Sequence, residues 1–151
     1  HRFVTVSNCL VNMVSPEIYR EWILPFDRKL AAVYGCIGIH NCAWNATPYL
    51  AAYAQIPGVG YIDMGIQSDL AQARALFPEA RRALMVTPMD LANQSTGELR
   101  AEFDRVAREY GPCDMVFGDV EAGTPDARVQ DAVAFCRRVS EGSTWKDGER
   151  K

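Results

Sequence analysis

An imidazole and a thiol lie two residues apart in the segment His40-Asn41-Cys42. This segment closes an apolar run, Cys36-Ile37-Gly38-Ile39, which is typical of a buried strand. Residues two apart in a strand point to the same face, about 7 Å apart along the chain. At the end of a strand both side chains can turn onto one zinc ion, since zinc accepts imidazole and thiolate ligands. A core histidine beside a buried thiol is the alternative interpretation of the same spacing.

Polar groups also follow the other apolar runs of the sequence. In parallel α/β proteins the functional site lies at the carboxyl ends of the strands. The groups expected at those ends are Cys9, Asn12, His40, Cys42, Asp63, Thr87, Asp90, Asp119 and Glu121. Each has a simpler interpretation, because the aspartates can cap the following helices and a cysteine can be a small buried hydrophobe. Their convergence on one rim still favours a site.

A zinc site at this rim needs a third protein ligand, which leaves the fourth position for a substrate. We predict Glu121 as that ligand, with Asp119 behind it, because both leave the fifth predicted strand on one face. A thiol bound to such a zinc ion is deprotonated near neutral pH, which activates it as a nucleophile. The predicted chemistry is therefore metal activation of a thiol.

Strand-like and helix-like segments alternate along the chain and must position these groups. The predicted strands are 3–8, 36–42, 59–64, 83–87 and 114–118, and the predicted helices are 15–34, 47–54, 69–77, 95–110 and 124–140. In the first helix Ser15 is the predicted cap, and Ile18, Trp22, Leu30 and Val33 are predicted to face inward. Five such units in series predict an α/β fold with a parallel sheet and covering helices.

Length, charge and composition limit the classes of function. The chain has 151 residues, enough for one domain, which we place at 1–142 with a polar tail at 143–151. A net charge of −3 gives no broad electrostatic reason to bind nucleic acid, and no apolar run approaches the ~20 residues of a membrane span. Five cysteines is an odd number, and together with a start that is no signal peptide it predicts a reducing, cytoplasmic location.

Two blocks of sequence carry a family resemblance. The stretch Ser15-Pro16-Glu17 through Leu24-Pro25-Phe26-Asp27, followed by Gly38-Ile39-His40-Asn41-Cys42, resembles the uroporphyrinogen decarboxylase superfamily. It is most similar to the corrinoid-dependent methyltransferase branch, in which a comparable helix precedes a strand that ends in His-x-Cys. The resemblance implies a (β/α)8 TIM barrel with a zinc ion at its mouth. It also implies that a methyl group passes between a corrinoid protein and a small thiol such as coenzyme M or homocysteine.

The resemblance assigns roles to individual residues. His40 and Cys42 match the first two zinc ligands of the family. The third family ligand is a cysteine in a Gly-Cys-Gly turn, where this chain has Gly118-Asp119-Val120-Glu121, so a carboxylate is implied as the third ligand. The substrate pocket is predicted to contain Cys9, Asn12, Trp44, Asn45, Asp63 and Asp119.

Five β-α units cannot close an eight-stranded barrel. We therefore expect the carboxyl-terminal part of a barrel, completed by a missing amino-terminal half or by a homodimer. Two other functions are compatible with the sequence. One is a metal-free uroporphyrinogen decarboxylase of tetrapyrrole biosynthesis, disfavoured because the arginines fall mostly on predicted helices rather than at the barrel mouth. The other is a non-catalytic half-barrel fragment.

Overall fold

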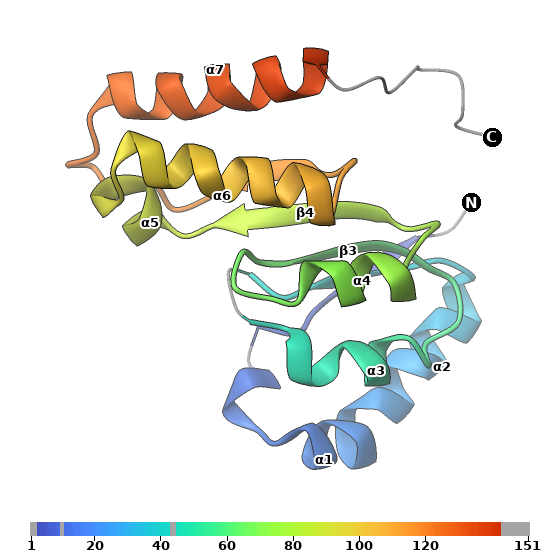
Figure 1. Cartoon of the computed structure of the whole chain (residues 1–151). Helices are drawn as coiled ribbons and strands as arrows, with labels where there is room; N and C mark the ends of the chain where they lie inside the picture. The colour runs from blue at the N-terminus through green and yellow to red at the C-terminus, as the bar shows by residue number, and fades with distance from the viewer. Residues whose placement is uncertain (1–2, 10, 43–44, 143–151) are drawn as a thin grey trace.

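A five-stranded parallel sheet forms the centre of the molecule (Figure 1). The computed structural model describes residues 3–9, 11–42 and 45–142. The strands are β1 (Val4–Ser7), β2 (Ile37–His40), β3 (Val59–Gly65), β4 (Arg81–Val86) and β5 (Asp114–Phe117). Their spatial order is their sequence order, and every neighbouring pair is parallel. The predicted α/β class and parallel sheet are confirmed.

One or more helices follow each strand. They are η1 (Val11–Met13), α1 (Pro16–Ile18), the π turn η2 (Tyr19–Ile23), α2 (Leu24–Tyr34), η3 (Thr47–Tyr49), α3 (Leu50–Tyr53), α4 (Leu70–Leu76), α5 (Pro88–Asn93), α6 (Thr96–Glu109) and α7 (Asp126–Gly142). A capping box begins α6, since Ser95 Oγ accepts from the amide of Glu98 and the Glu98 carboxylate accepts from the amide of Ser95. Within the described residues, no helix combines the length and the apolar character that crossing a membrane requires.

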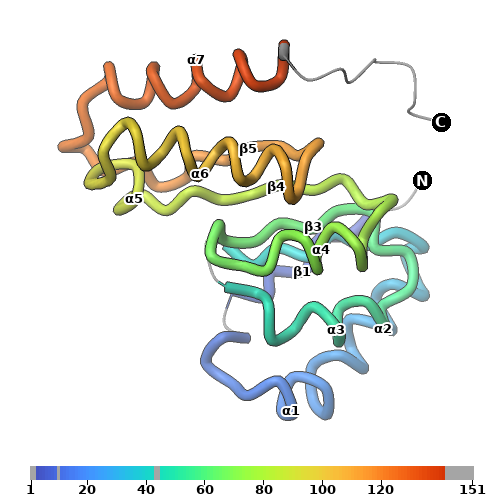
Figure 2. Tube along the Cα trace, in the orientation of Figure 1, coloured from blue at the N-terminus to red at the C-terminus, as the bar shows by residue number. Residues whose placement is uncertain are grey.

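One face of the sheet carries the apolar core. Side chains that alternate along the strands, such as Val6, Ile39, Ile62, Met64 and Leu84, pack with residues of the helices in a single cluster. A second, smaller cluster joins the end of β4 to α6 and α7. Figures 1 and 2 show the helices following one another in sequence order around the sheet, from α1 at one extreme to α7 at the other.

The opposite face of the sheet is more polar. The strand register aligns Thr5, Tyr61 and Arg81 across this face. Asp63 and Asp114 align in the same way, through Ala83 of β4 between them. Arg81 Nε and an oxygen of Asp114 form an exposed ion pair of 2.6 Å on this face. Among the described strands, β1 pairs with β2 alone and β5 with β4 alone, so the sheet is open at both edges.

The segment between β1 and β2 differs from the helix predicted for residues 15–34. The π turn η2 separates α1 from α2, and Pro25 lies in the first turn of α2. The predicted inward face is wrong: Ile18, Trp22, Leu30 and Val33 are all exposed. The buried face consists instead of Tyr19, Leu24, Asp27 and Ala31. The Tyr19 hydroxyl donates a hydrogen bond to the Asp27 carboxylate, which satisfies both polar groups in the core. The face that carries this pair is therefore buried, although the opposite face is more apolar.

Candidate metal centre

Three metal-binding side chains meet at the carboxyl ends of β1 and β2. The register pairs Ser7 with His40, and each of the two cysteines, Cys9 and Cys42, lies two residues beyond its paired residue. The ligand atoms of Cys9, His40 and Cys42 all lie within 4.8 Å of one another. The two sulfur atoms are 2.6 Å apart, and Cys42 Sγ is 3.2 Å from His40 Nε2. This cluster is close enough to hold a metal ion.

Asp63 on β3 orients the histidine. His40 Nδ1 lies 2.7 Å from Asp63 Oδ2, and the carboxylate is 95% buried whereas the imidazole is about a third exposed. A hydrogen bond to Nδ1 leaves Nε2 free as a ligand, and Nε2 is the nitrogen that faces Cys42. The arrangement is the carboxylate–histidine pair that commonly supports a protein metal ligand.

A hydrogen-bond network fixes Asp63 and the turn that follows β2. The Asn41 amide donates to Asp63 Oδ1 at 2.8 Å, and the Tyr61 hydroxyl donates to Asp63 Oδ2 at 2.8 Å. The Asn41 side chain donates to the Asp63 carbonyl and accepts from the Tyr53 hydroxyl. With the backbone held at Asn41, the chain turns sharply and Cys42 takes a left-handed conformation with φ 48°.

A second buried network supports the cysteine of β1. The Asn8 amide donates to the His40 carbonyl at 2.7 Å, which ties the end of β1 to the end of β2. The Asn8 side chain and the Tyr19 hydroxyl both donate to Asp27 Oδ2, at 3.2 and 2.7 Å. Burial raises the pKa of Asp27 above its ordinary value, although both hydrogen bonds oppose the shift. Cys9 therefore follows directly on a residue that is anchored to the core.

The surroundings of Cys42 favour a cation. Burial, the hydrogen bond with Cys9, and the charges of Cys9, Asp63 and Asp119 raise the pKa of the Cys42 thiol to about 12. In the absence of a positive charge this thiol therefore stays protonated at neutral pH. A divalent cation between the two sulfurs offsets the same negative charges and releases the proton, as metal binding to cysteine requires.

The donor set also fits the chemistry of a soft or borderline metal. Two sulfurs and one imidazole nitrogen are ligands that suit zinc, and a tetrahedral ion keeps two sulfur ligands about 3.8 Å apart at normal bond lengths. Cys9 and Cys42 would need to part by roughly 1 Å to reach that separation from their 2.6 Å. Both side chains are only partly buried, which leaves room for such a movement.

The cluster differs in one member from the predicted ligands. His40 and Cys42 come together as expected, and the third group is Cys9, which the sequence analysis placed in the substrate pocket. Glu121 is exposed in the loop after β5 and does not belong to this group of three. Asp119 is also exposed, with φ 52°, but its negative charge contributes to the raised pKa of the Cys42 thiol.

The other predicted pocket residues have separate positions. Asp63 is buried against His40, as described above. Asn12 is half-buried in η1. Asn45 is exposed, and its side chain accepts from the Thr47 amide at 3.0 Å in a local turn. Trp44 lies outside the described residues. Sequence reasoning missed Tyr53 and Tyr61 as supports of the centre. The Tyr53 hydroxyl reaches Asn41 from α3, which no local pattern marks, whereas Tyr61 and Asp63 lie two residues apart on one face of β3, a spacing that was available in the sequence.

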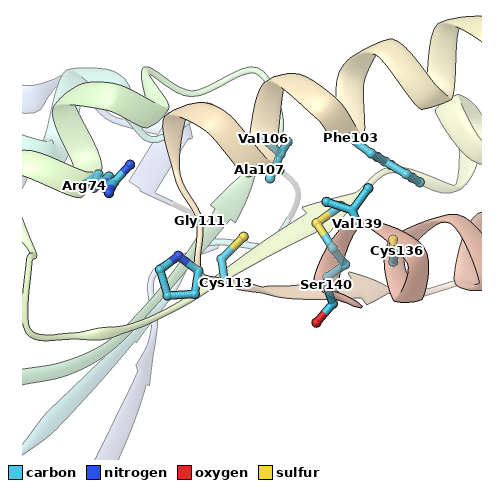
Figure 3. A pocket seen from close by; sticks show the side chains of 11 residues that line it. Arg74, Phe103, Val106, Ala107, Gly111, Cys113, Cys136, Val139 and Ser140 are labelled. Atoms are coloured by element: carbon cyan, nitrogen blue, oxygen red, sulfur yellow. The ribbon is translucent and has the colours of Figure 1, made fainter. Parts of the chain in front are cut away.

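A separate cavity lies toward the other end of the sheet. It has a volume of about 390 Å³ and is lined by α6, the loop before β5, and the last turns of α7, including Phe103, Cys113, Cys136 and Val139 (Figure 3). Because Cys113 precedes β5, this cavity is at the amino end of that strand, whereas the metal centre is at the carboxyl ends of β1 and β2.

Comparison of the sequence with models of known protein families and with curated proteins finds no match.

Proposed function

We propose that this protein binds zinc through Cys9, His40 and Cys42 and transfers a methyl group from a corrinoid protein to a small thiol. The observation that carries the proposal is the cluster itself, in which a buried carboxylate orients the imidazole toward two cysteines. The family resemblance of the His-x-Cys segment supplies the reaction class. The alternative third ligand is Glu121 in place of Cys9, and Asp119 remains proposed as a pocket residue.

Zinc at this position would lower the pKa of a thiol substrate, so that the thiol reacts as a thiolate at neutral pH. The protein's own residues prepare that role. Asp63 holds the proton of His40 on Nδ1 and thereby keeps Nε2 available. Three protein ligands leave one position for the substrate sulfur, and the half-buried cysteines keep that position accessible. In such a transfer the thiol would lose its proton and gain a sulfur–carbon bond, and the methyl donor would keep the electron pair of the cobalt–carbon bond that breaks.

We also propose that the five units belong to a (β/α)8 barrel. The uniform strand order, the apolar face that packs the helices, and the polar opposite face support this architecture. The open edges at β1 and β5 would pair with a missing amino-terminal half or with a second copy. Sedimentation equilibrium tests the second copy: a dimer that dissociates on dilution is expected, and a monomer at all concentrations would refute pairing with a second copy.

Metal analysis and X-ray absorption test the function directly. The purified, reduced chain is expected to hold about one zinc ion, with two sulfur neighbours. Addition of 2-mercaptoethanesulfonate or homocysteine is expected to raise the sulfur count to three. The variant Cys36→Ser, whose thiol lies outside the cluster, serves as the control and should behave like the wild type. Reduced, folded protein that takes up no zinc would refute the proposal.

Methyl transfer is then measured with methylcobalamin and the same thiols. The reaction is followed by the loss of the methylcobalamin absorbance and by the mass of the thioether product. Variants His40→Ala and Cys42→Ser are expected to abolish the transfer. Zinc binding without methyl transfer to either thiol would support the proposed zinc site and refute the proposed methyltransferase activity.

A further inference from the structure

We propose that Cys9 and Cys42 form an oxidation site, at which a peroxide converts the two thiols into a disulfide and expels the metal. The release of a metal ion rests on the proposed function, whereas the formation of the disulfide does not. The pair would make the centre sensitive to oxidants, with a metal-binding reduced form and a metal-free oxidised form.

The geometry of the two sulfurs carries the inference. They lie 2.6 Å apart, so they need to approach by only about 0.5 Å to reach the bond length of a disulfide. They follow the ends of the adjacent parallel strands β1 and β2, and those ends are tied together by the hydrogen bond from the Asn8 backbone amide to the His40 carbonyl. Both cysteines are partly exposed, so a small oxidant can reach them. The backbone therefore already holds the two thiols together before any bond forms.

The chemistry is balanced with one molecule of hydrogen peroxide. One thiolate attacks a peroxide oxygen, which breaks the O–O bond and gives a sulfenic acid and hydroxide. The second thiolate attacks the sulfenic sulfur, forms the S–S bond and expels a second hydroxide. The two cysteines lose two electrons and two protons, and the peroxide becomes two molecules of water. Disulfide sulfurs are poor metal ligands, so His40 would be the sole ligand left of the three.

The other three cysteines are placed where this chemistry does not reach. Cys36 precedes β2 and lies four residues before His40, about 13 Å away along an extended strand. Cys113 and Cys136 line the cavity at the amino end of β5 (Figure 3). Neither of them belongs to the group of side chains whose ligand atoms come together at the ends of β1 and β2.

The test uses the zinc-loaded, reduced chain and a small excess of hydrogen peroxide. A chromogenic chelator follows zinc release while mass spectrometry follows the loss of two hydrogen atoms. Trypsin leaves Cys9 on a peptide of residues 3–20 and both Cys36 and Cys42 on a peptide of residues 30–74. The Cys36→Ser background therefore makes the cross-link assignment unique. The expected result is one zinc released per disulfide, with peptides 3–20 and 30–74 linked.

Matched variants separate this pair from the rest of the chain. Cys9→Ser and Cys42→Ser should each give no linked peptide, whereas Cys113→Ser and Cys136→Ser should give the same link as wild type. Reduction with dithiothreitol should restore zinc binding. Peroxide that leaves both thiols free, or oxidises them to sulfinic acids without linking them, would overturn the inference.

The experiment distinguishes failure of the proposed function from failure of the proposed oxidation site. Protein that binds zinc but forms no disulfide keeps the proposed function and loses the oxidation site. Protein that binds no zinc but forms the link between Cys9 and Cys42 loses the proposed function and keeps the proposed disulfide. The metal-free, reduced chain is therefore treated with peroxide in parallel.

Discussion

His40 Nδ1 and Asp63 Oδ2 lie 2.7 Å apart, and together they join the carboxyl end of β2 to the middle of β3. The imidazole, the Asn41 amide and the Tyr61 hydroxyl are three donors that converge on the two oxygens of one carboxylate. The position of the metal ligand therefore depends on a side chain from a different strand.

Replacement of Asp63 by asparagine should weaken metal binding. Asparagine offers a single acceptor oxygen, so at least one of the three donors loses its partner. We expect zinc affinity to fall about 10- to 100-fold and the free energy of unfolding to fall by about 1–3 kcal/mol. Competition with a chromogenic chelator and chemical denaturation measure the two effects. The control is Tyr61→Phe, which removes one donor and leaves His40 bonded; equal losses of affinity in both variants would contradict this role for Asp63.

The third metal ligand can be identified by comparing two substitutions. Cys9→Ser replaces a thiolate of the cluster, whereas Glu121→Gln removes the charge of a carboxylate outside it. We expect zinc affinity to fall by a factor of 100 or more in the first variant and by less than about twofold in the second, because a serine hydroxyl is a poor zinc ligand. Zinc titration of both variants decides between them. The opposite ranking would restore the carboxylate that the sequence analysis predicted.

Asp27 should make stability depend on pH. Burial raises its pKa in the folded state above the ordinary 3.8, so the folded chain binds this proton more tightly than the unfolded chain does. The resulting stabilisation is present below pH 3.8 and is lost as the pH rises through the raised folded pKa. Asp27→Asn keeps an oxygen that accepts from Tyr19 but cannot ionise. We expect the free energy of unfolding of this variant, measured by chemical denaturation, to vary less between pH 4 and 7 than that of the wild type. Superimposable pH profiles would argue against this role of Asp27.

Arg82 should contribute to stability but not to the metal centre. It is 6% exposed, and its guanidinium donates to the carbonyls of Phe77, at 3.0 Å, and Tyr110, at 3.2 Å. Arg82→Met leaves these carbonyls without a donor, which should cost about 3 kcal/mol. Arg82→Lys keeps the charge but not the planar fork, and an intermediate loss is expected. Thermal and chemical unfolding measure the loss, while zinc affinity of the folded variants should match wild type because Arg82 is near the amino end of β4.

The sequence predicted the elements well because their signals are local. All five predicted strands are present, each with ends within two residues of the prediction. Ser15 caps its helix as expected, and Asp69 and Ser95 cap α4 and α6 in the same way, since a capping side chain acts on amides only a few residues away. The short helix α5 was missed, although Thr87 and Pro88 form the same cap-then-proline signal at its start.

The faces of the elements were harder to predict. The stripe of Trp22 and Val33 is more apolar than the face that is buried, and burial of Asp27 depends on donors from Asn8 and Tyr19. The π turn also changes the angular position of every residue after it, which no helical period of 3.6 anticipates. Tertiary hydrogen bonds decided which side of α2 faces the core.

The metal centre was predictable in part. His40 and Cys42 follow from their spacing on one strand, but Cys9 comes from another strand and depends on the register that pairs Ser7 with His40. The sequence does contain a signal for Cys9. Ser7 pairs with His40, and a cysteine lies two residues after each of them. Using it requires the register, which the sequence of a single chain does not supply.

The left-handed backbone at Cys42 has a consequence for engineering. Asparagine and aspartate adopt this conformation more readily than most other residues, so either can replace the cysteine with little disturbance of the bend. An aspartate there would exchange a soft sulfur donor for a hard oxygen donor. The cluster would then offer one sulfur, one nitrogen and one oxygen, a harder donor set reached by a single codon change, while the imidazole and its supporting carboxylate stay as they are.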